Sequence, residues 1–349
     1  MNTFIKTGRH YIKPYYLLQK RQSNLKHIFL FSTTTTMSMA NSHGAGDSPQ
    51  SAYPERRGWM HILQSAKFKL DYNHDKTQVV VHHPGLSYEA YKRDSNPSIS
   101  SLLMLPMTAR AYAYHKPMDQ SGATFLDYAK MTADHFTFMV SVVMEIESTM
   151  YDPLIDKIPL DVKLSLGFIG KTSLNSVAEV SLPSNGMTLM RNCNQVVLVD
   201  KATRKPTPVP DWWKQKYSSS TVGNTALIIP KLTKPESVHL CKLFVAWSDT
   251  DNYNHTTSAS YPRFAVDAIH HASSSNFLKI ISENHFKAGV KRVEMSFLGE
   301  SAEGDLLEIC VWEDQQKPIA YCEFLRGGET IHQSSVEYHT PPAYSDVGI

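Results

Sequence analysis

The sequence predicts an α+β fold built from a duplicated unit. Each half contains a long apolar-rich segment, and each such segment is followed by runs with the alternating or β-branched pattern of antiparallel strands. A short internal similarity points the same way, because 166–173 (LGFIGKTS) resembles 295–302 (MSFLGESA) and 178–180 resembles 307–309. A helix followed by an antiparallel meander, repeated once, lets each sheet cover the apolar faces of its own helix.

In the first half we expect short strands, one long helix and then three longer strands. The segments 67–72 and 78–82 favour strands, and 109–115 predicts another short one. The segment 122–150 has apolar residues on more than one face, which predicts a helix buried on most sides and ended by Pro153. The strands expected after this helix are 162–169, 176–182 and 187–199.

The second half repeats this order. The run 240–247 predicts a strand, and the apolar period that follows predicts a helix over 258–283. The strands expected after it are 290–298, 306–312 and 319–326. The proline- and tryptophan-rich stretch that joins the halves, about 200–233, should lie outside both sheets.

Charge and composition divide the chain further. Residues 1–46 carry six basic residues and no acid, with many Ser and Thr, which is typical of a mitochondrial presequence; a disordered tail on a cytoplasmic protein is the alternative. The Ser/Gly/Pro-rich residues 47–58 predict a linker. The segments expected after it are a first unit at 59–210, a linker at 211–235 and a second unit at 236–340.

Several functional classes are disfavoured. Without the first 46 residues the chain is slightly acidic, which argues against nucleic-acid binding, and no apolar run is long enough to span a membrane. The sequence lacks G-x-S-x-G, a P-loop and G-x-G-x-x-G, so we expect neither a serine esterase nor a nucleotide cofactor. The four scattered cysteines are expected to be reduced thiols, and the adjacent pairs His82-His83 and His270-His271 lack metal-ligand spacing, so no metal is expected.

The candidate site lies where the strand at 240–247 leads through an acidic turn into the helix. An acid and an imidazole at the start of a helix face the positive end of its dipole. The spacing of four residues between Asp251 and His255 lets the two side chains meet across a tight turn, as activation of a water molecule requires. Asp249 is expected to brace the turn. The full pattern is Trp247-Ser248-Asp249-x-Asp251-x-x-x-His255-x-x-x-x-x-Tyr261.

This pattern resembles the D-x-D-x-x-x-H-x-N-N-x-x-Y signature of hotdog thioesterases. Its aromatic-Ser-Asp-x-Asp start is most similar to the fatty acyl-ACP thioesterases of plants and bacteria, and it is more distantly similar to 4-hydroxybenzoyl-CoA thioesterases. Two departures stand out: Thr257-Ser258 replace the Asn pair, and Tyr253 stands where the plant enzymes have Asn, with Asn254 one place later. The resemblance implies a tandem, or double, hotdog, in which each half is a long helix wrapped by an antiparallel sheet.

The resemblance also implies a function, the hydrolysis of fatty acyl thioesters carried by acyl carrier protein or coenzyme A, without a cofactor. It assigns carboxylate roles to Asp251 and to Glu300, the match of a Glu in a strand turn of the family, and makes His255 the general base or its partner. Lys171 stands at the matching place of the first copy, so a single site in the second half is expected. The residues expected to bind substrate are Trp247, Asp249, Tyr253, Asn254, Thr257, Ser258 and Tyr261.

The backbone N–H groups of 257–260 are expected to receive the oxyanion, and both helices should line an apolar acyl tunnel. Two alternatives remain open. One is a hotdog hydratase acting on enoyl thioesters, and the other is a non-catalytic module that binds acyl chains or an acyl carrier. A homodimer is also left open.

Overall fold

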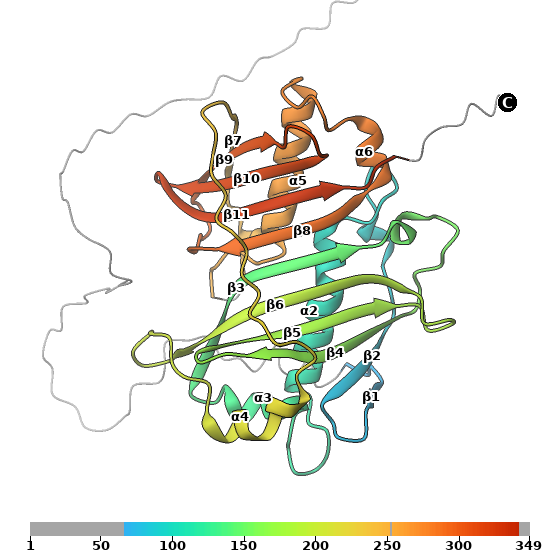
Figure 1. The fold of residues 1–349 in the computed structure, drawn as a ribbon, viewed down its shortest axis with the longest axis vertical. Coiled ribbons are helices and arrows are strands. Elements are labelled where there is room, and N and C mark those ends of the chain that lie inside the picture. The colour runs from blue at the N-terminus through green and yellow to red at the C-terminus, as the bar shows by residue number, and fades with distance from the viewer. Residues whose placement is uncertain (1–65, 252, 342–349) are drawn as a thin grey trace, which may run out of the picture. The chain divides into compact units, whose positions relative to one another are not determined.

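The computed structural model describes residues 66–251 and 253–341. The expected tail at 1–46, the linker at 47–58 and the start of the first unit at 59 lie outside the described residues. In the described part, eleven antiparallel strands form one sheet in the order β1-β2-β4-β5-β6-β3-β8-β11-β10-β9-β7, with helices against it (Figure 1). The expected α+β class is confirmed. No helix among these residues combines the length and the apolar character that crossing a membrane requires.

The elements of the first half are listed here in chain order. They are β1 (Leu70–Tyr72), β2 (Gln78–His83), η1 (Tyr88–Ala90), α2 (Ile99–His115), η2 (Phe125–Asp127), α3 (Tyr128–Met131), β3 (His135–Ile146), η3 (Ser148–Tyr151), β4 (Leu160–Ile169), β5 (Ser173–Ser181) and β6 (Thr188–Asp200).

The connection and the second half follow. They contain α4 (Asp211–Tyr217), η4 (Ser218–Ser220), β7 (His239–Phe244), η5 (Trp247–Asp249), α5 (Ser260–Ser274), α6 (Glu283–Ala288), β8 (Val290–Phe297), β9 (Leu306–Glu313), β10 (Ile319–Arg326) and β11 (Glu329–Tyr338).

Both halves have the same strand order. In the first it is β2-β4-β5-β6-β3, and in the second it is β7-β9-β10-β11-β8, so each half runs strand, helix, strand and three-stranded meander. The halves join edge to edge through β3 and β8, where Val142 lies opposite Met295. This repeated order supports the duplication that the sequence indicates.

The helix of the first half lies earlier in the chain than the sequence predicts. Residues 109–115, expected as a strand, form the C-terminal part of α2. The helix expected at 122–150 is absent, and the twelve-residue strand β3 occupies its centre. Because β3 pairs with β6 on one side and β8 on the other, it is a central strand with little polar alternation. Such an apolar run cannot be told from a buried helix by its period.

The residue correspondence between the two halves also changes. The segment 166–173 lies at the end of β4 and the turn into β5, whereas 295–302 follows from the end of β8, whose counterpart is β3. Lys171 is therefore not the structural counterpart of Glu300. The internal similarity belongs to the ends of two strands that occupy different places in the repeated order.

The helix expected at 258–283 is interrupted. The structure has α5 at Ser260–Ser274 and α6 at Glu283–Ala288. Between them lies Ser-Ser-Asn at 274–276, where Asn276 adopts φ 57°. Serine and asparagine favour helix ends, and Asn tolerates the left-handed conformation, so the helix stops there.

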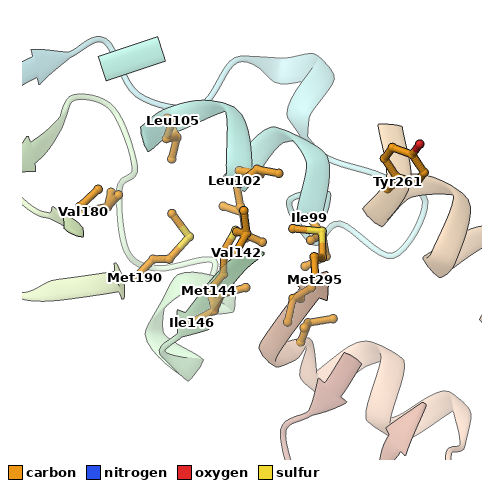
Figure 2. Packing of buried hydrophobic residues seen from close by; sticks show 14 of the residues in the cluster. Ile99, Leu102, Leu105, Val142, Met144, Ile146, Val180, Met190, Tyr261 and Met295 are labelled. Atoms are coloured by element: carbon orange, nitrogen blue, oxygen red, sulfur yellow. The ribbon is translucent and has the colours of Figure 1, made fainter. Parts of the chain in front are cut away.

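The core forms between the two long helices and the sheet. Figure 2 shows Ile99 and Leu102 of α2 pointing toward the β3 and β8 side chains Val142 and Met295, all less than 10% exposed. The chain between α4 and β7 crosses the other face of the sheet (Figure 1). Side-chain amides hold it there: Gln195 Oε1 accepts the Leu227 N–H at 2.9 Å, and Gln333 Oε1 accepts the Leu232 N–H at 2.9 Å.

Candidate active site

The acidic turn between β7 and α5 is closed by backbone hydrogen bonds. The Asp251 N–H donates to the His255 carbonyl at 2.9 Å, and Thr250 and Thr256 form a β-bridge. The carboxylate of Asp251 folds back onto this turn, where Oδ1 accepts the N–H of Tyr253 at 2.8 Å and the N–H of His255 at 3.2 Å. Asp251 therefore shapes the loop that presents His255.

The imidazole of His255 meets Glu300. Its Nε2 lies 3.4 Å from Glu300 Oε2, and the two side chains are 36% and 51% exposed. Glu300 lies in the loop between β8 and β9, which returns to the start of α5. The sequence predicted that Asp251, His255 and Glu300 converge. The structure brings the last two side chains together, while the contact of Asp251 with His255 is through the backbone N–H.

A buried cluster of three hydroxyl groups holds the two segments in register. Thr256 N–H donates to the Ser301 carbonyl at 2.7 Å, and the Thr256 and Ser301 hydroxyl oxygens are 2.7 Å apart. The Tyr261 hydroxyl lies 3.0 Å from Ser301 Oγ. Thr256 and Ser301 directly follow His255 and Glu300 in the chain, so this cluster fixes the spacing of the acid and the imidazole. The sequence pattern included Tyr261 but gave no signal for Thr256 or Ser301.

Asp249 braces the turn, as expected. It is 5% exposed, its Oδ2 accepts the Ala246 N–H at 2.9 Å, and it forms an ion pair with Arg263 of α5. Its carbonyl accepts from the Thr257 N–H at 2.9 Å and the Ser260 hydroxyl at 3.0 Å. The contacts with Arg263 and Ser260 tie the turn to the helix, and the other two close the turn itself.

The other sequence-predicted residues differ in exposure. Trp247 is 77% exposed and Tyr253 36% exposed at the surface, whereas Tyr261 is 2% exposed. Asn254 occupies the turn with φ 60°, and Thr257 Oγ1 lies 3.0 Å from Ser260 Oγ. Ser258 reaches the first half, where its hydroxyl contacts Met107 Sδ of α2 at 3.3 Å. Tyr261 thus lies in the core beneath the turn, and Ser258 lies where the two helices meet.

Two of the expected oxyanion donors are already engaged. The N–H groups of Thr257 and Ser260 donate to the carbonyls of Asp249 and Thr257, at 2.9 and 3.0 Å. Between 257 and 260, only the N–H groups of Ser258 and Ala259 have no backbone acceptor among the described residues. Two of the four N–H groups that the sequence predicted as oxyanion donors are therefore available at the start of α5.

No family model matches the chain, and no curated protein matches its sequence. Solved structures do match it. The chain is similar to a 12:0-ACP thioesterase from Umbellularia californica, with a TM-score of 0.56 and 16% identity over 75% of this chain and 97% of that one. It is also similar to an acyl-ACP thioesterase from Bacteroides thetaiotaomicron, with a TM-score of 0.51 and 13% identity over 76% and 100% of the two chains. A protein described as an oleoyl thioesterase from Lactobacillus plantarum gives 0.53 and 13%, over 78% and 98%. The chain has an α+β hotdog fold.

The first half of this hotdog protein contains the same turn without the acid and the imidazole. The loop before α2 also has a 3₁₀ turn, a bridge between Tyr91 and Pro97, and a left-handed residue, Ser95, with φ 65°. Lys92 N–H donates to the Asn96 carbonyl at 3.0 Å, as Asp251 N–H does to the His255 carbonyl. Lys92 and Asn96 therefore stand where the second half has the acid and the imidazole. The sequence predicted the first helix at 122–150, which is wrong because α2 starts at Ile99, and the turn before it was therefore missed.

A second histidine lies beneath the hotdog turn, in the interior. His332 of β11 is 0% exposed, and its ring stacks on Tyr261 with centroids 4.4 Å apart. Neither ring nitrogen has a hydrogen-bond partner, and burial lowers the pKa of His332 to about 3. In the repeated order its counterpart is Met190, because Met190 pairs with Ile146 of β3 as His332 pairs with Phe297 of β8.

His332→Met is expected to stabilise the protein and to weaken its acid sensitivity. An unpaired buried polar group costs about 1–3 kcal/mol, and Met190 shows that the fold accepts methionine at this place. The pKa of His332 is lower in the folded chain than its ordinary 6.5, so the unfolded chain binds the extra proton. Folding stability then falls as the pH drops from about 6.5 toward 3, by up to about 1.4 kcal/mol per pH unit from this group.

Urea unfolding of the parent and of His332→Met, at neutral pH and near pH 5, measures this. Each protein gives a loss of unfolding free energy on acidification, and the difference between the two losses isolates His332 from the other titrating groups. Equal losses on acidification would show that His332 is not held neutral in the fold.

Proposed function

We propose that the chain is a tandem hotdog acyl thioesterase that hydrolyses fatty acyl thioesters of acyl carrier protein or coenzyme A. The observation that carries this is the pairing of His255 with Glu300 at the start of α5, in one half only. The equivalent turn of the other half has Lys92 and Asn96, which cannot act as an acid–base pair. The likeness to acyl-ACP thioesterases supports thioester hydrolysis as the reaction.

In this proposal Glu300 orients the imidazole and stabilises its protonated form. His255 accepts a proton from a water molecule whose oxygen attacks the thioester carbonyl carbon. The carbonyl oxygen becomes an oxyanion, for which the N–H groups of Ser258 and Ala259 at the start of α5 are the donors. The C–S bond then breaks, the fatty acid leaves, and the thiolate takes up the proton that His255 holds.

The positions of Ser258 and Met107 suggest how the first half takes part. Their contact at 3.3 Å places the oxyanion donors next to α2, between the two helices. The non-catalytic half would then hold part of the acyl chain against α2, while the second half performs the chemistry. Acyl carrier protein and coenzyme A both present the thioester on the same phosphopantetheine arm, so either carrier fits this arrangement.

Turnover of a panel of acyl-CoAs and acyl-ACPs tests the proposal. With saturated medium- and long-chain substrates, the purified chain is expected to release free thiol in stoichiometric amounts with fatty acid. Enoyl thioesters should give no 3-hydroxyacyl product. Acyl-chain binding without thiol release would favour the non-catalytic binding module, which the role of Asp251 as a turn former also allows.

A further inference from the structure

Three metal-binding side chains meet away from the candidate active site. His239 and Cys241 lie two residues apart on β7, so their side chains share one face of the strand. His271 belongs to α5, the helix that lies beside β7 (Figure 1). His239 Nε2 is 2.7 Å from His271 Nδ1, Cys241 Sγ is 3.5 Å from the same nitrogen, and all three atoms lie within 4.8 Å of one another.

We propose that His239 Nε2, Cys241 Sγ and His271 Nδ1 bind one Zn²⁺ ion. Zinc takes imidazole nitrogen and thiolate sulfur, at about 2.0–2.1 Å and 2.3 Å, in a tetrahedral arrangement. These bond lengths put ligand atoms roughly 3.3–3.8 Å apart around one centre. Only the contact between the two imidazoles is shorter, because it is a hydrogen bond. The ion takes the place of that proton, which moves to the other nitrogen of the same imidazole, and small side-chain rotations part the two ligand nitrogens.

Zinc binds imidazole in its neutral form and cysteine as the thiolate. The Cys241 thiol proton is therefore released to solvent when the Zn–S bond forms.

The fourth coordination position would face an open cleft. A cavity of about 690 Å³ lies between β7 and α5 and is lined by Cys241 and His271, with Asp267 and Arg263 further along the helix. Asp267 precedes His271 by four residues, so the two share one face of α5. A water molecule or an anion can complete the coordination there.

The sequence could not reveal this cluster. His270 and His271 are adjacent, and their rings point apart: His270 packs on the Phe286 ring with centroids 4.0 Å apart, while His271 contacts His239 of β7. The other two ligands come from a strand about 30 residues earlier in the chain. Because β7 pairs only with β9 in the described sheet, the ion would also fasten this edge strand to α5.

Zinc binding to the full, tag-free chain tests the inference. Competition with a chromogenic chelator, with the metal content measured by mass spectrometry, is expected to show one tightly bound Zn²⁺ per chain. Cys241→Ser and His271→Gln should each weaken the affinity by more than the roughly 10- to 100-fold that losing a partner of a ligand costs. Co²⁺ should give a thiolate charge-transfer band with the parent chain and none with Cys241→Ser.

The control is His270→Gln, which removes the neighbouring imidazole outside the cluster and should leave Zn²⁺ affinity unchanged. Thermal melts without metal show whether each variant folds, and zinc should raise the melting temperature of the parent chain but not of Cys241→Ser. Two results overturn the inference. One is the absence of stoichiometric Zn²⁺ binding, and the other is binding that survives in the folded double variant of Cys241→Ser and His271→Gln.

Discussion

Replacing His255 by glutamine is expected to lower kcat for acyl thioester hydrolysis by about 100- to 10,000-fold, the usual contribution of a positioned general base. Glutamine keeps a polar side chain of similar reach but cannot take a proton from water. The turn should survive, because its hydrogen bonds use the backbone N–H and carbonyl of residue 255. Single-turnover kinetics with a saturating acyl-CoA measure the chemical step, and a thermal melt shows that the fold is kept.

A matched control comes from another histidine–acid pair. His74 Nδ1 lies 2.8 Å from Asp75 Oδ1 in the β1–β2 turn, and the His74 side chain is fully exposed. His74→Gln removes a similar contact far from the start of α5 and should leave kcat unchanged. If His255→Gln keeps a rate within a few-fold of the parent, the His255–Glu300 contact is only a surface ion pair.

Glu300→Gln is a companion to the first variant. A glutamine at 300 keeps an oxygen beside His255 but cannot stabilise the imidazolium by charge. Its loss of rate should therefore be smaller than that of His255→Gln. The order of the two losses tests whether the carboxylate acts through the imidazole.

The secondary structure of the second half was predicted more accurately than that of the first, because the apolar residues of its elements recur with a clear period. β7, β8, β9 and β10 lie within a few residues of their predicted places, and α5 has a clear apolar period. β11 was missed, since its centre reads Gln333, Ser334 and Ser335, which is polar for a strand. The Gln333 side chain meets the connecting chain at Leu232 and Glu323 of the neighbouring strand β10, a tertiary environment that a local pattern does not contain.

The helix of the first half was misplaced because burial on several sides removes the periodicity of apolar residues in the sequence. α2 packs against the sheet and against α5, so its apolar residues surround it, and Pro106 inside it argues against a helix in the sequence. β3 is equally apolar for a different reason, as a central strand. With no period in either segment, the longer apolar run was taken for the helix.

The candidate site also contains residues that the sequence could predict and contacts that it could not. Asp251 and His255 are close in the chain, so a spacing argument finds them, and the family resemblance pointed to Glu300. The contacts that hold them could not be predicted, since Ser301 and Thr256 are 45 residues apart and ordinary in type. His332 is equally hidden, because nothing in its local sequence shows that β11 carries it under Tyr261.

Asp251→Asn is expected to lower kcat by about 100- to 10,000-fold while leaving the melting temperature nearly unchanged. The structure makes this substitution informative. Asp251 supports the turn through Oδ1, which accepts two N–H groups, and asparagine has the same oxygen in the same place. The turn, and with it the position of His255, should persist. What the variant loses is the negative charge, which in this proposal helps to orient the attacking water beside His255.

Asp249→Asn tests whether the two aspartates of this turn, Asp249 and Asp251, have different roles. Asp249 is buried and forms an ion pair with Arg263, so its neutralisation should lower the melting temperature as well as any rate. If Asp251→Asn instead keeps full turnover, the Asp251 carboxylate serves only the turn, and the chemistry rests on His255 and Glu300. If neither Asp251→Asn nor His255→Gln changes a measurable rate while acyl chains still bind, the second half is a binding module that has kept the geometry of the turn without its reaction.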